Sequence, residues 1–408
     1  MSVEITFIRH GQTTGNAAGR WQGHTNSSLT ATGEDQAARL AQRLAGKHFD
    51  LVISSDLDRT VETAAALRRP VETDTRWREP FFGEWEDLES EVIMKRYSAD
   101  LAALFGGEDI ALGGGERLSE VMERTREALN EVVARVGEGS VAVVSHGMAL
   151  LTLFTGLLEI KRPSPLRLLG NTAIATMNVD NGAISVPRYN DHTHLPESGA
   201  SHFGHSPEDT EVFLVRHGET VSNQERRWQG HQDGMLSETG RTQAVRLGAS
   251  FPTLDALYSS PLTRAADTAN AIASQQSLDL TFEPGLKEIG FGAWEGMTKP
   301  EIAEKYPDEY EDFRNGSDAA RGGTGETFAG VRRRMAASMD NIIGRHPGEN
   351  VGVVSHGGAT RAWVTEILGI PYENRNRLSI LDNTGYARVA FTMRGPALVS
   401  WNLAPHLT

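Results

Sequence analysis

The sequence predicts two tandem α/β domains, each built on a largely parallel sheet that helices cover. Two observations carry this prediction. The same series of motifs occurs twice along the 408 residues, and within each copy apolar runs of strand length alternate with segments of helical periodicity. A repeat of about 200 residues is too long for a solenoid unit, so it indicates a duplicated domain.

Three polar motifs define the repeat and follow one another in the same order in both halves. They are Arg9-His10-Gly11 with Arg216-His217-Gly218, Ser54-Ser55 with Ser259-Ser260, and Ser145-His146-Gly147 with Ser355-His356-Gly357. We expect one domain over residues 1–195 and a second over 211–408. The segment 196–210 between them is rich in Pro, Gly and Ser, which is typical of a linker.

The elements of each half follow from local patterns. In the first half, apolar runs predict strands at residues 5–8, 51–53, 141–144 and 173–179. The apolar spacing of residues 37–44 predicts an amphipathic helix that Gly46 closes, and a longer helix is expected over 118–133. Residues 80–115 carry few strand signals, so we expect a helical or loop-rich lid there.

Composition and charge exclude several classes of function. The net charge of −14 disfavours a general nucleic-acid or anionic-membrane binder, although a local arginine cluster can still hold an anion. The absence of cysteine excludes disulfides, thiol nucleophiles and cysteine-bound metals. The chain begins without a basic and apolar signal segment, so we expect a cytoplasmic protein.

One apolar stretch, residues 141–160, is long enough to resemble a membrane span. The matching stretch, residues 351–370, contains Arg361 and Glu366. Because a charged pair does not suit a span, we expect a buried strand, a short turn and a helix in both copies, and no membrane partner.

Each polar motif stands directly behind a predicted strand. The carboxyl ends of strands in open α/β sheets line one crevice, so each half should gather two histidines and two arginines in one pocket. These residues are Arg9, His10, Arg59 and His146 in the first half and Arg216, His217, Arg264 and His356 in the second. Two guanidinium groups suit a tetrahedral, doubly charged oxyanion such as a phosphoryl group. Gly147 and Gly357 let the backbone approach such a ligand closely.

Other conspicuous residues have a structural interpretation. Trp85 and Trp294 are expected in the core or wall, and the acidic run at 84–91 on a solvated face. Four histidines are expected to be non-catalytic: His24, His192, His194 and His406. No metal site is predicted, because the motif histidines stand beside arginine, which repels a cation, and no carboxylate stands at ligand spacing.

In content and order, these motifs resemble those of the histidine phosphatase superfamily, also called the phosphoglycerate mutase-like family. The resemblance covers almost the whole chain twice. It rests on RHGQT and RHGET, two WQG turns, the two serine pairs with Arg59 and Arg264 behind them, FGEWE and FGAWE, and two SHG motifs. It implies a three-layer α/β/α domain with a mostly parallel sheet and a helical insertion over the site, in two tandem copies.

The resemblance also implies roles for single residues. His10 and His217 would be nucleophiles that form a phosphohistidine, and the arginines and the second histidine of each half would hold the phosphate. Glu79 and Glu288 would protonate the leaving oxygen. Polar pocket contacts would come from Asn16 and Asn223, with secondary contacts from Gln22 and Gln229. The implied activity is hydrolysis of small phosphorylated metabolites without a metal or other cofactor.

Two alternatives remain beside a phosphatase. Mutases that resemble this chain carry an ERHYG-type segment around the acid, whereas this chain has EPFFGEWED and EIGFGAWEG, which favour hydrolysis. The other alternative is a phosphate-ester binding or regulatory module with one inactive half. Both halves retain the two histidines, two arginines and the glutamate, which favours an enzyme. Substrate choice is assigned to the lids at 86–116 and 295–326, and an oligomer is compatible with the sequence.

The two halves differ beside the second histidine. Arg361 stands five residues after His356, where the first half has Leu151, and Asp87 replaces Gly296. Losing an arginine weakens attraction for highly charged esters, and an aspartate is expected to add repulsion and to prevent a positive φ. We therefore predict that the second half dominates on such esters. In the alternative interpretation, Arg361 only forms a surface salt bridge.

Overall fold

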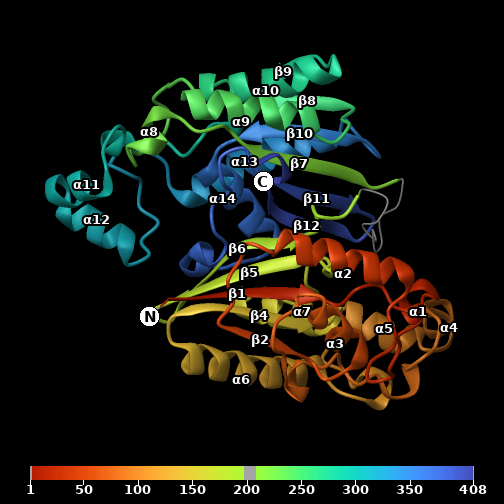
Figure 1. The fold of residues 1–408 in the computed structure, drawn as a ribbon. Coiled ribbons are helices and arrows are strands. Elements are labelled where there is room, and N and C mark those ends of the chain that lie inside the picture. Colours follow the sequence, from red (N-terminus) through yellow and green to blue (C-terminus); the bar gives the residue numbers. More distant parts are fainter. Residues whose placement is uncertain (1, 197–207, 408) are drawn as a thin grey trace. The chain divides into compact units, whose positions relative to one another are not determined.

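The computed structural model describes residues 2–196 and 208–407, which form two compact units (Figure 1). Most of the predicted linker, residues 196–210, lies outside the described residues, so the predicted domain bounds stay predictions.

The first unit has one six-stranded sheet in the order β3-β2-β4-β1-β5-β6. The strands are β1 (Ser2–Arg9), β2 (Leu51–Ser54), β3 (Glu72–Thr73), β4 (Gly139–Ser145), β5 (Ile174–Asp180) and β6 (Ala183–Asp191). The neighbours from β3 to β1 pair in parallel, whereas β5 and β6 are antiparallel additions beside β1. The mostly parallel sheet is confirmed, and all four predicted strands are present.

The second unit repeats this topology in the order β9-β8-β10-β7-β11-β12. Its strands are β7 (Thr210–Arg216), β8 (Ala256–Ser259), β9 (Leu280–Phe282), β10 (Asn350–Ser355), β11 (Tyr386–Thr392) and β12 (Gly395–Leu403). Again the pairs from β9 to β7 are parallel and the last two strands are antiparallel.

Helices cover both faces of each sheet. The first unit has α1 (Thr14–Ala17), α2 (Ala31–Arg43), α3 (Asp58–Ala65), α4 (Ser90–Arg96), α5 (Ser98–Phe105), α6 (Leu118–Val136) and α7 (Gly147–Leu157). The second has α8 (Val221–Gln224), α9 (Glu238–Ser250), α10 (Thr263–Gln276), α11 (Lys299–Lys305), α12 (Pro307–Arg314), α13 (Phe328–Ile343) and α14 (Gly357–Ile367). Helix α2 ends at Arg43, before the Gly46 that was expected to close it.

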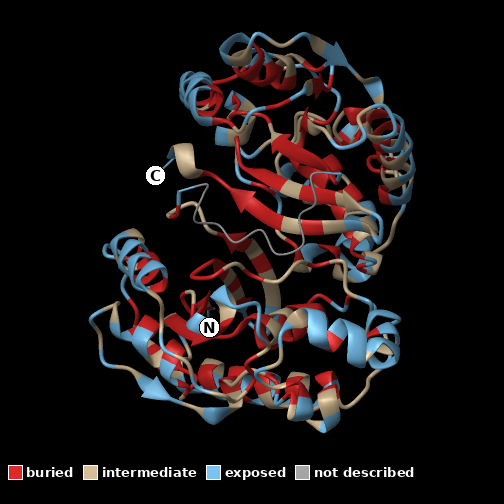
Figure 2. Cartoon of the chain, turned by 90° about the vertical axis from the view of Figure 1, so that its right-hand side faces the viewer, coloured by how far each residue is buried: buried red, intermediate tan, exposed pale blue. Residues whose placement is uncertain are grey.

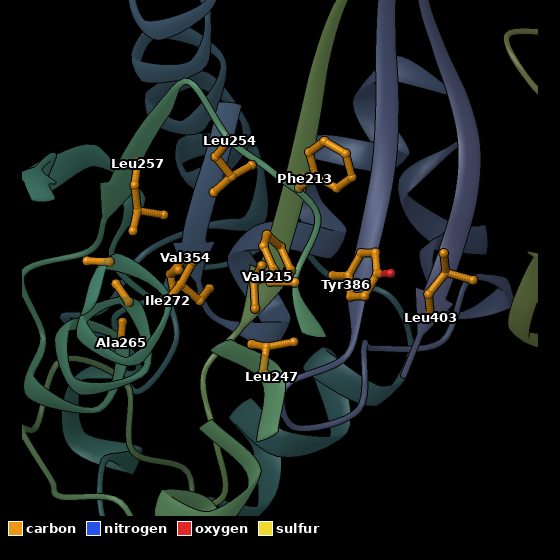
Figure 3. Packing of buried hydrophobic residues seen from close by; sticks show 13 residues of the cluster. Phe213, Val215, Leu247, Leu254, Leu257, Ala265, Ile272, Val354, Tyr386 and Leu403 are labelled. Atoms are coloured by element: carbon orange, nitrogen blue, oxygen red, sulfur yellow. The ribbon is translucent and has the colours of Figure 1, made fainter. Parts of the chain in front are cut away.

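Alternating side chains of the strands make the two core layers. In the first unit, Ile8 packs with Leu40 of α2 and Ala64 of α3 on one face. Phe7 meets Phe154 of α7 on the other face, with ring centroids 5.3 Å apart. Figure 3 shows the first of these layers in the second unit, where α9 and α10 cover Phe213, Val215 and their neighbours. The strands are largely buried, whereas the helices expose their outer sides (Figure 2). The three-layer prediction is confirmed.

The predicted lid of the first unit is helical, with α4 and α5 packed around Trp85. Trp85 and Trp294 are both buried, as expected. The acidic run is not wholly solvated. Glu86 accepts hydrogen bonds from His24 N (2.7 Å) and Thr25 Oγ1 (2.8 Å), because the turn that contains these residues needs an acceptor for its backbone N–H.

Residues 141–160 form the end of β4, a turn and α7, as predicted. Among residues 2–196 and 208–407, no helix has both the length and the apolar character that crossing a membrane requires.

Candidate active site

The parallel order β2-β4-β1 places all three motifs of the first unit at one sheet edge. Arg9 ends β1, Ser145 ends β4 and Ser54 ends β2, so His10 and His146 follow directly behind neighbouring strands. The two imidazole rings lie 5.2 Å apart between centroids, and those of His217 and His356 lie 5.1 Å apart. The predicted gathering of the motifs is present in both units.

Each candidate nucleophile is held in one tautomer. Nδ1 of His10 lies 2.7 Å from the carbonyl oxygen of Gly11, and Nδ1 of His217 lies 2.7 Å from that of Gly218. Only a protonated nitrogen can donate to a carbonyl, so Nε2 of the neutral ring carries the lone pair. Burial lowers the pKa of His10 well below its usual range, and the nearby Arg59 and Arg9 lower this pKa further. The ring is therefore neutral at physiological pH.

Two glycines let the loop after the candidate nucleophile His10, called the nucleophile loop here, fit against the start of α2. A Cβ at Gly11 would lie 2.7 Å from the carbonyl oxygen of Gly33, and a Cβ at Gly33 would lie 2.1 Å from that of Gln12. Such separations are well inside van der Waals contact, so side chains at these positions would displace the loop. The backbone N–H of Gly11 donates to Thr63 Oγ1 at 3.0 Å, which fixes the loop against α3.

Arg59 keeps a net positive charge in the pocket, although it is only 1% exposed. Its Nη2 donates to the carbonyl of Gly23 (2.6 Å) and its Nη1 to that of Thr25 (2.9 Å), and no carboxylate within the described residues forms a salt bridge with it. Burial lowers its pKa to about 10. Arg264 makes the matching contacts to Gly230 and Gln232. Carbonyl groups orient these guanidinium groups without neutralising them, which suits an anionic ligand.

The other arginine of each pocket ends the first strand. Nη1 of Arg9 donates to the carbonyl of Leu169 at 2.6 Å, and Nη1 of Arg216 donates to that of Leu381 at 2.7 Å. A Cβ at Gly147 would lie 3.3 Å from the guanidinium carbon of Arg9, so a side chain there would crowd this guanidinium group. The close approach of the Gly147 and Gly357 backbone to a ligand stays a prediction.

The second histidine is oriented by a serine in both units. Nε2 of His146 lies 2.9 Å from Ser55 Oγ, and its Nδ1 accepts from Nε of Arg59 at 3.2 Å. Nε2 of His356 lies 2.8 Å from Ser260 Oγ. Nδ1 of His356 and Nε of Arg264 have no hydrogen-bond partner within the described residues, whereas the equivalent atoms of the first unit, Nδ1 of His146 and Nε of Arg59, bond to each other.

Glu79 lies at the N-terminus of α7. Its Oε1 accepts from the backbone N–H of Met148 (2.9 Å) and its Oε2 from that of Ala149 (3.1 Å). Burial raises the pKa of Glu79 above its usual range, and this effect exceeds the lowering by the two N–H groups and by Arg59 and Arg9. Glu288 accepts the matching bonds from Gly358 and Ala359, and a third from Ile289 N.

Asn16 and Gln22, whose side-chain amides were both predicted to contact a ligand, make different contacts in the structure. Oδ1 of Asn16 accepts from Nδ2 of Asn171 at 3.2 Å, so the Asn16 amide stands beside the nucleophile loop. Gln22 is engaged at both ends, by Thr13 Oγ1 at 2.6 Å and by Ser27 Oγ. Asn223 and Gln229 repeat the contacts to Asn383 and Thr220. Gln22 thus braces the loop, and its contact with a ligand stays a prediction.

Residues 5–192 and 212–404 each match the sequence profile of the histidine phosphatase superfamily (branch 1). The chain belongs to this superfamily. The two matched regions account for nearly all of both units, so the chain is a tandem pair of histidine phosphatase domains.

Several known proteins are similar to one unit of this histidine phosphatase. Phosphoserine phosphatase 1 of Hydrogenobacter thermophilus is 33% identical over 198 residues, 48% of this chain and 93% of that protein. Metal-independent phosphoserine phosphatase of Arabidopsis thaliana is 42% identical over 161 residues, 38% of this chain and 67% of that protein. Probable phosphoglycerate mutase GpmB of Cronobacter sakazakii is 33% identical over 192 residues, 47% of this chain and 88% of that protein.

Among solved structures, a phosphoserine phosphatase from Entamoeba histolytica in complex with phosphoserine is 30% identical. The match covers 49% of this histidine phosphatase and 100% of that chain, with a TM-score of 0.45.

Two histidines of this histidine phosphatase have a supporting position that sequence reasoning missed. His194 Nε2 lies 3.0 Å from Thr172 Oγ1, and the backbone N–H of Thr172 donates to the carbonyl of Arg9 at 3.1 Å. His406 and Thr384 repeat the pair at 2.8 Å. The signal that could have found them is spacing, because each histidine stands 22 residues after its threonine.

Two differences between the histidine phosphatase units were predicted, at Arg361 and at Asp87. Arg361 is not a surface residue of a salt bridge; its Nε is buried, and no salt bridge to it occurs within the described residues. The expectation for Asp87 was wrong. Asp87 adopts a φ of +60°, because aspartate tolerates the left-handed region, and its carboxylate pairs with Arg20 at 3.2 Å while 60% exposed. It therefore adds no buried repulsion.

Within residues 2–196 and 208–407, no group of three potential ligands among His, Asp and Glu stands close enough to hold a metal ion.

Proposed function

We propose that each unit hydrolyses small phosphomonoesters through a phosphohistidine on His10 or His217, without a metal ion. One observation carries the proposal above all others. A neutral imidazole, whose Nδ1–H is held by a carbonyl, presents its Nε2 lone pair in a pocket beside Arg59 or Arg264, and no carboxylate of the described residues forms a salt bridge with either arginine.

In the first step, the lone pair of His10 Nε2 forms a bond to phosphorus while the ester P–O bond breaks. The proton of Glu79 passes to the leaving oxygen, which departs as an alcohol. Positive charge develops on the imidazole ring, where the carbonyl of Gly11 accepts from Nδ1–H at 2.7 Å. Arg9, Arg59 and His146 stabilise the charge on the phosphoryl oxygens, a contribution that is usually the largest in catalysis.

In the second step, the Glu79 carboxylate takes a proton from water, and the hydroxide forms a bond to phosphorus. The P–N bond breaks, its electron pair returns to Nε2, and inorganic phosphate leaves. The raised pKa of Glu79 suits both roles, because a carboxyl group that titrates nearer to neutrality gives and takes a proton more readily.

Hydrolysis is favoured over the two alternatives by separate observations. Two of the relatives named above are phosphoserine phosphatases, which supports a phosphatase and makes phosphoserine the first ester to test. A binding module has no need of a proton donor, whereas both units place a glutamate beside the pocket. The similarity to a probable phosphoglycerate mutase makes the product from 3-phosphoglycerate the deciding measurement.

The test compares the full chain with His10→Ala, His217→Ala and the double variant, in EDTA, on phosphoserine and 3-phosphoglycerate. We expect inorganic phosphate as product, an acid-labile phosphoenzyme, and less than about 1% of the turnover in the double variant. His48→Ala is the control, because His48 is 77% exposed and lies outside the site.

Each other outcome contradicts a stated part of the proposal. Appearance of 2-phosphoglycerate faster than phosphate would identify a mutase. Turnover that survives in the double variant would exclude both nucleophiles, and loss in EDTA restored by a divalent ion would exclude metal independence. Binding of esters without any phosphoenzyme would identify a binding module.

A further inference from the structure

Three arginines gather beside the pocket of the second unit. They come from three different elements: Arg321 from the loop between α12 and α13, Arg361 from α14, and Arg375 from a short 3₁₀ segment at Tyr372–Arg377. None of them belongs to the motifs that define the two phosphate pockets.

Tyr372 joins two of these arginines. The guanidinium carbon of Arg375 lies 3.8 Å from the centroid of the Tyr372 ring, and Nη2 of Arg321 donates to the Tyr372 hydroxyl at 3.0 Å. Both guanidinium groups also lie near the ring of Phe313, at 5.8 and 5.2 Å. Arg375 is 4% exposed and Arg321 is 3% exposed. Aromatic rings thus hold two buried positive charges side by side.

Arg361 connects this cluster to the catalytic groups. It stands one helical turn after Gly358, whose backbone N–H holds Glu288, and α14 packs against the 3₁₀ segment that contains Arg375. Its Nε is buried, and no residue of 2–196 or 208–407 forms a hydrogen bond with it. Burial and the charge of Arg375 lower the pKa of Arg361 to about 10, while Glu288 acts in the opposite direction. Arg361 is therefore close to both the cluster and the catalytic carboxylate.

The charges of this cluster are not balanced. Asp318 pairs with Arg321 at 3.1 Å. Neither Arg361 nor Arg375 forms a salt bridge with any carboxylate in the part of the chain that the structure describes. Arg375 is buried, and Arg361 is partly exposed with a buried Nε. Withdrawing an unpaired charge from water is costly, so two such groups beside an anion pocket indicate that a ligand supplies the missing negative charge.

The first unit has a different surface at the matching positions. Gly113 and Gly322 both have a positive φ and both lie against the carbonyl of a matching phenylalanine, so Leu112 corresponds to Arg321. Leu151 corresponds to Arg361. Leu112 is buried in the apolar lid cluster, against which Met148 also packs. Arg162, in the loop after α7, is paired with Asp109 at 2.8 Å, so its charge is balanced.

The geometry points to an anion subsite in the second unit, in which Arg361 and Arg375 bind a second negatively charged group of the phosphate ester. A carboxylate or a second phosphate has the oxygen geometry that a guanidinium group binds best. The first unit lacks this subsite and takes esters whose alcohol part is uncharged. This division of substrates rests on the proposed hydrolysis.

The experiment uses two esters that differ in a single group. 3-Phosphoglycerate carries a carboxylate where sn-glycerol 3-phosphate carries a hydroxymethyl group. In the full chain with His10→Ala, hydrolysis reports the second unit alone. Arg361→Leu introduces the residue of the first unit. We expect it to lower kcat/KM for 3-phosphoglycerate, relative to kcat/KM for sn-glycerol 3-phosphate, at least tenfold through a higher KM for 3-phosphoglycerate. Arg375→Gln should act in the same direction, and Arg333→Leu, an exposed arginine of α13, should leave the ratio within twofold.

A binding measurement separates this inference from the proposed function. In the chain with both His10→Ala and His217→Ala, calorimetric titration with the same two esters should show the same tenfold loss of preference on Arg361→Leu. Propane-1,3-diol bisphosphate shows which second anion the subsite binds. Tighter binding of this bisphosphate than of 3-phosphoglycerate indicates that the subsite binds a phosphate rather than a carboxylate. If Arg361→Leu leaves the binding preference for 3-phosphoglycerate over sn-glycerol 3-phosphate unchanged, the subsite is overturned even when hydrolysis is observed. A preference that falls in binding while neither ester is hydrolysed overturns the function and supports the subsite.

Discussion

Replacement of Glu79 by glutamine separates the chemical role of this residue from its structural one. The carboxylate joins two N–H groups at the start of α7, at 2.9 and 3.1 Å, and is buried beside the phosphate pocket. A glutamine has nearly the same shape, but it has one acceptor oxygen and no proton to donate to a leaving alkoxide. The variant therefore removes the acid while it keeps most of the packing.

The expected magnitudes differ for the two roles. Loss of a general acid lowers the rate of alcohol departure by about 10²–10⁴-fold, which corresponds to about 2.7–5.4 kcal/mol in the barrier. For stability, one backbone N–H loses its acceptor, at a cost of about 1–3 kcal/mol. Part of this cost is offset, because a glutamine removes the burial of an ionised carboxylate. The raised pKa of Glu79 shows that this burial is unfavourable.

The assay uses leaving groups that differ in their need for a proton. In the chain with His217→Ala, rapid mixing of Glu79→Gln with p-nitrophenyl phosphate should show a burst of p-nitrophenolate at nearly the unmodified rate, because this weak base leaves without protonation. The burst should then give way to slow turnover, because the hydroxide-forming step also needs Glu79. With sn-glycerol 3-phosphate, whose alcohol part is uncharged, formation of the phosphoenzyme should fall by the full factor. An equal fold loss on both esters would refute the assignment of Glu79 as the acid.

Two further predictions follow from the geometry around the nucleophile. In an NMR pH titration, His10 and His217 should stay neutral to well below pH 6.5. Burial lowers their pKa most, and the neighbouring arginines (Arg59 and Arg9, or Arg264 and Arg216) lower it further, so the nucleophilic form persists on acidification. A titration midpoint at or above 6.5 would contradict this prediction. In urea unfolding, Gly33→Ala should lower the free energy of unfolding by about 1–3 kcal/mol, because the new Cβ would meet the carbonyl of Gln12. Gly46→Ala is the control: its Cβ would meet nothing within 4 Å, so the free energy should change by less than about 0.5 kcal/mol. Similar values for the two variants would refute the steric argument.

Much of the site could be predicted because it depends on strand ends. Arg9, His10 and His146 stand directly behind apolar runs, and the parallel order of those strands brings their ends together without further information. The lid was predicted only as a region poor in strand signals. Its packing around Trp85 depends on contacts between α4, α5 and the loop after them, which have no periodic pattern.

Contacts made across loops could not be predicted in this way. Gln22 was expected near a ligand, but its two hydrogen bonds to Thr13 and Ser27 depend on the path of the turn between α1 and α2. Asp87 was expected to avoid a positive φ, but aspartate tolerates the left-handed region better than most residues, and its carboxylate pairs with Arg20 in this conformation. Arg321 and Arg375 come from segments whose lengths differ between the copies, so their approach to Tyr372 has no counterpart in the repeat.

The two copies differ in residues around the pocket, such as Arg321, Arg361 and Arg375, and agree in the groups inside it. Both copies keep the histidine pair, the carbonyl contacts of Arg59 and Arg264, and the glutamate at the start of a helix. In the proposed hydrolysis, each of these groups acts on the phosphoryl group that all such esters share. The residues proposed to meet the alcohol part lie in the lid and in the turns of α7 and α14. A leucine at such a position is stable by itself, whereas an unpaired arginine is costly to withdraw from water unless a ligand supplies the opposite charge. The proposed anion subsite therefore accounts for Arg361 and Arg375 better than their effect on stability does.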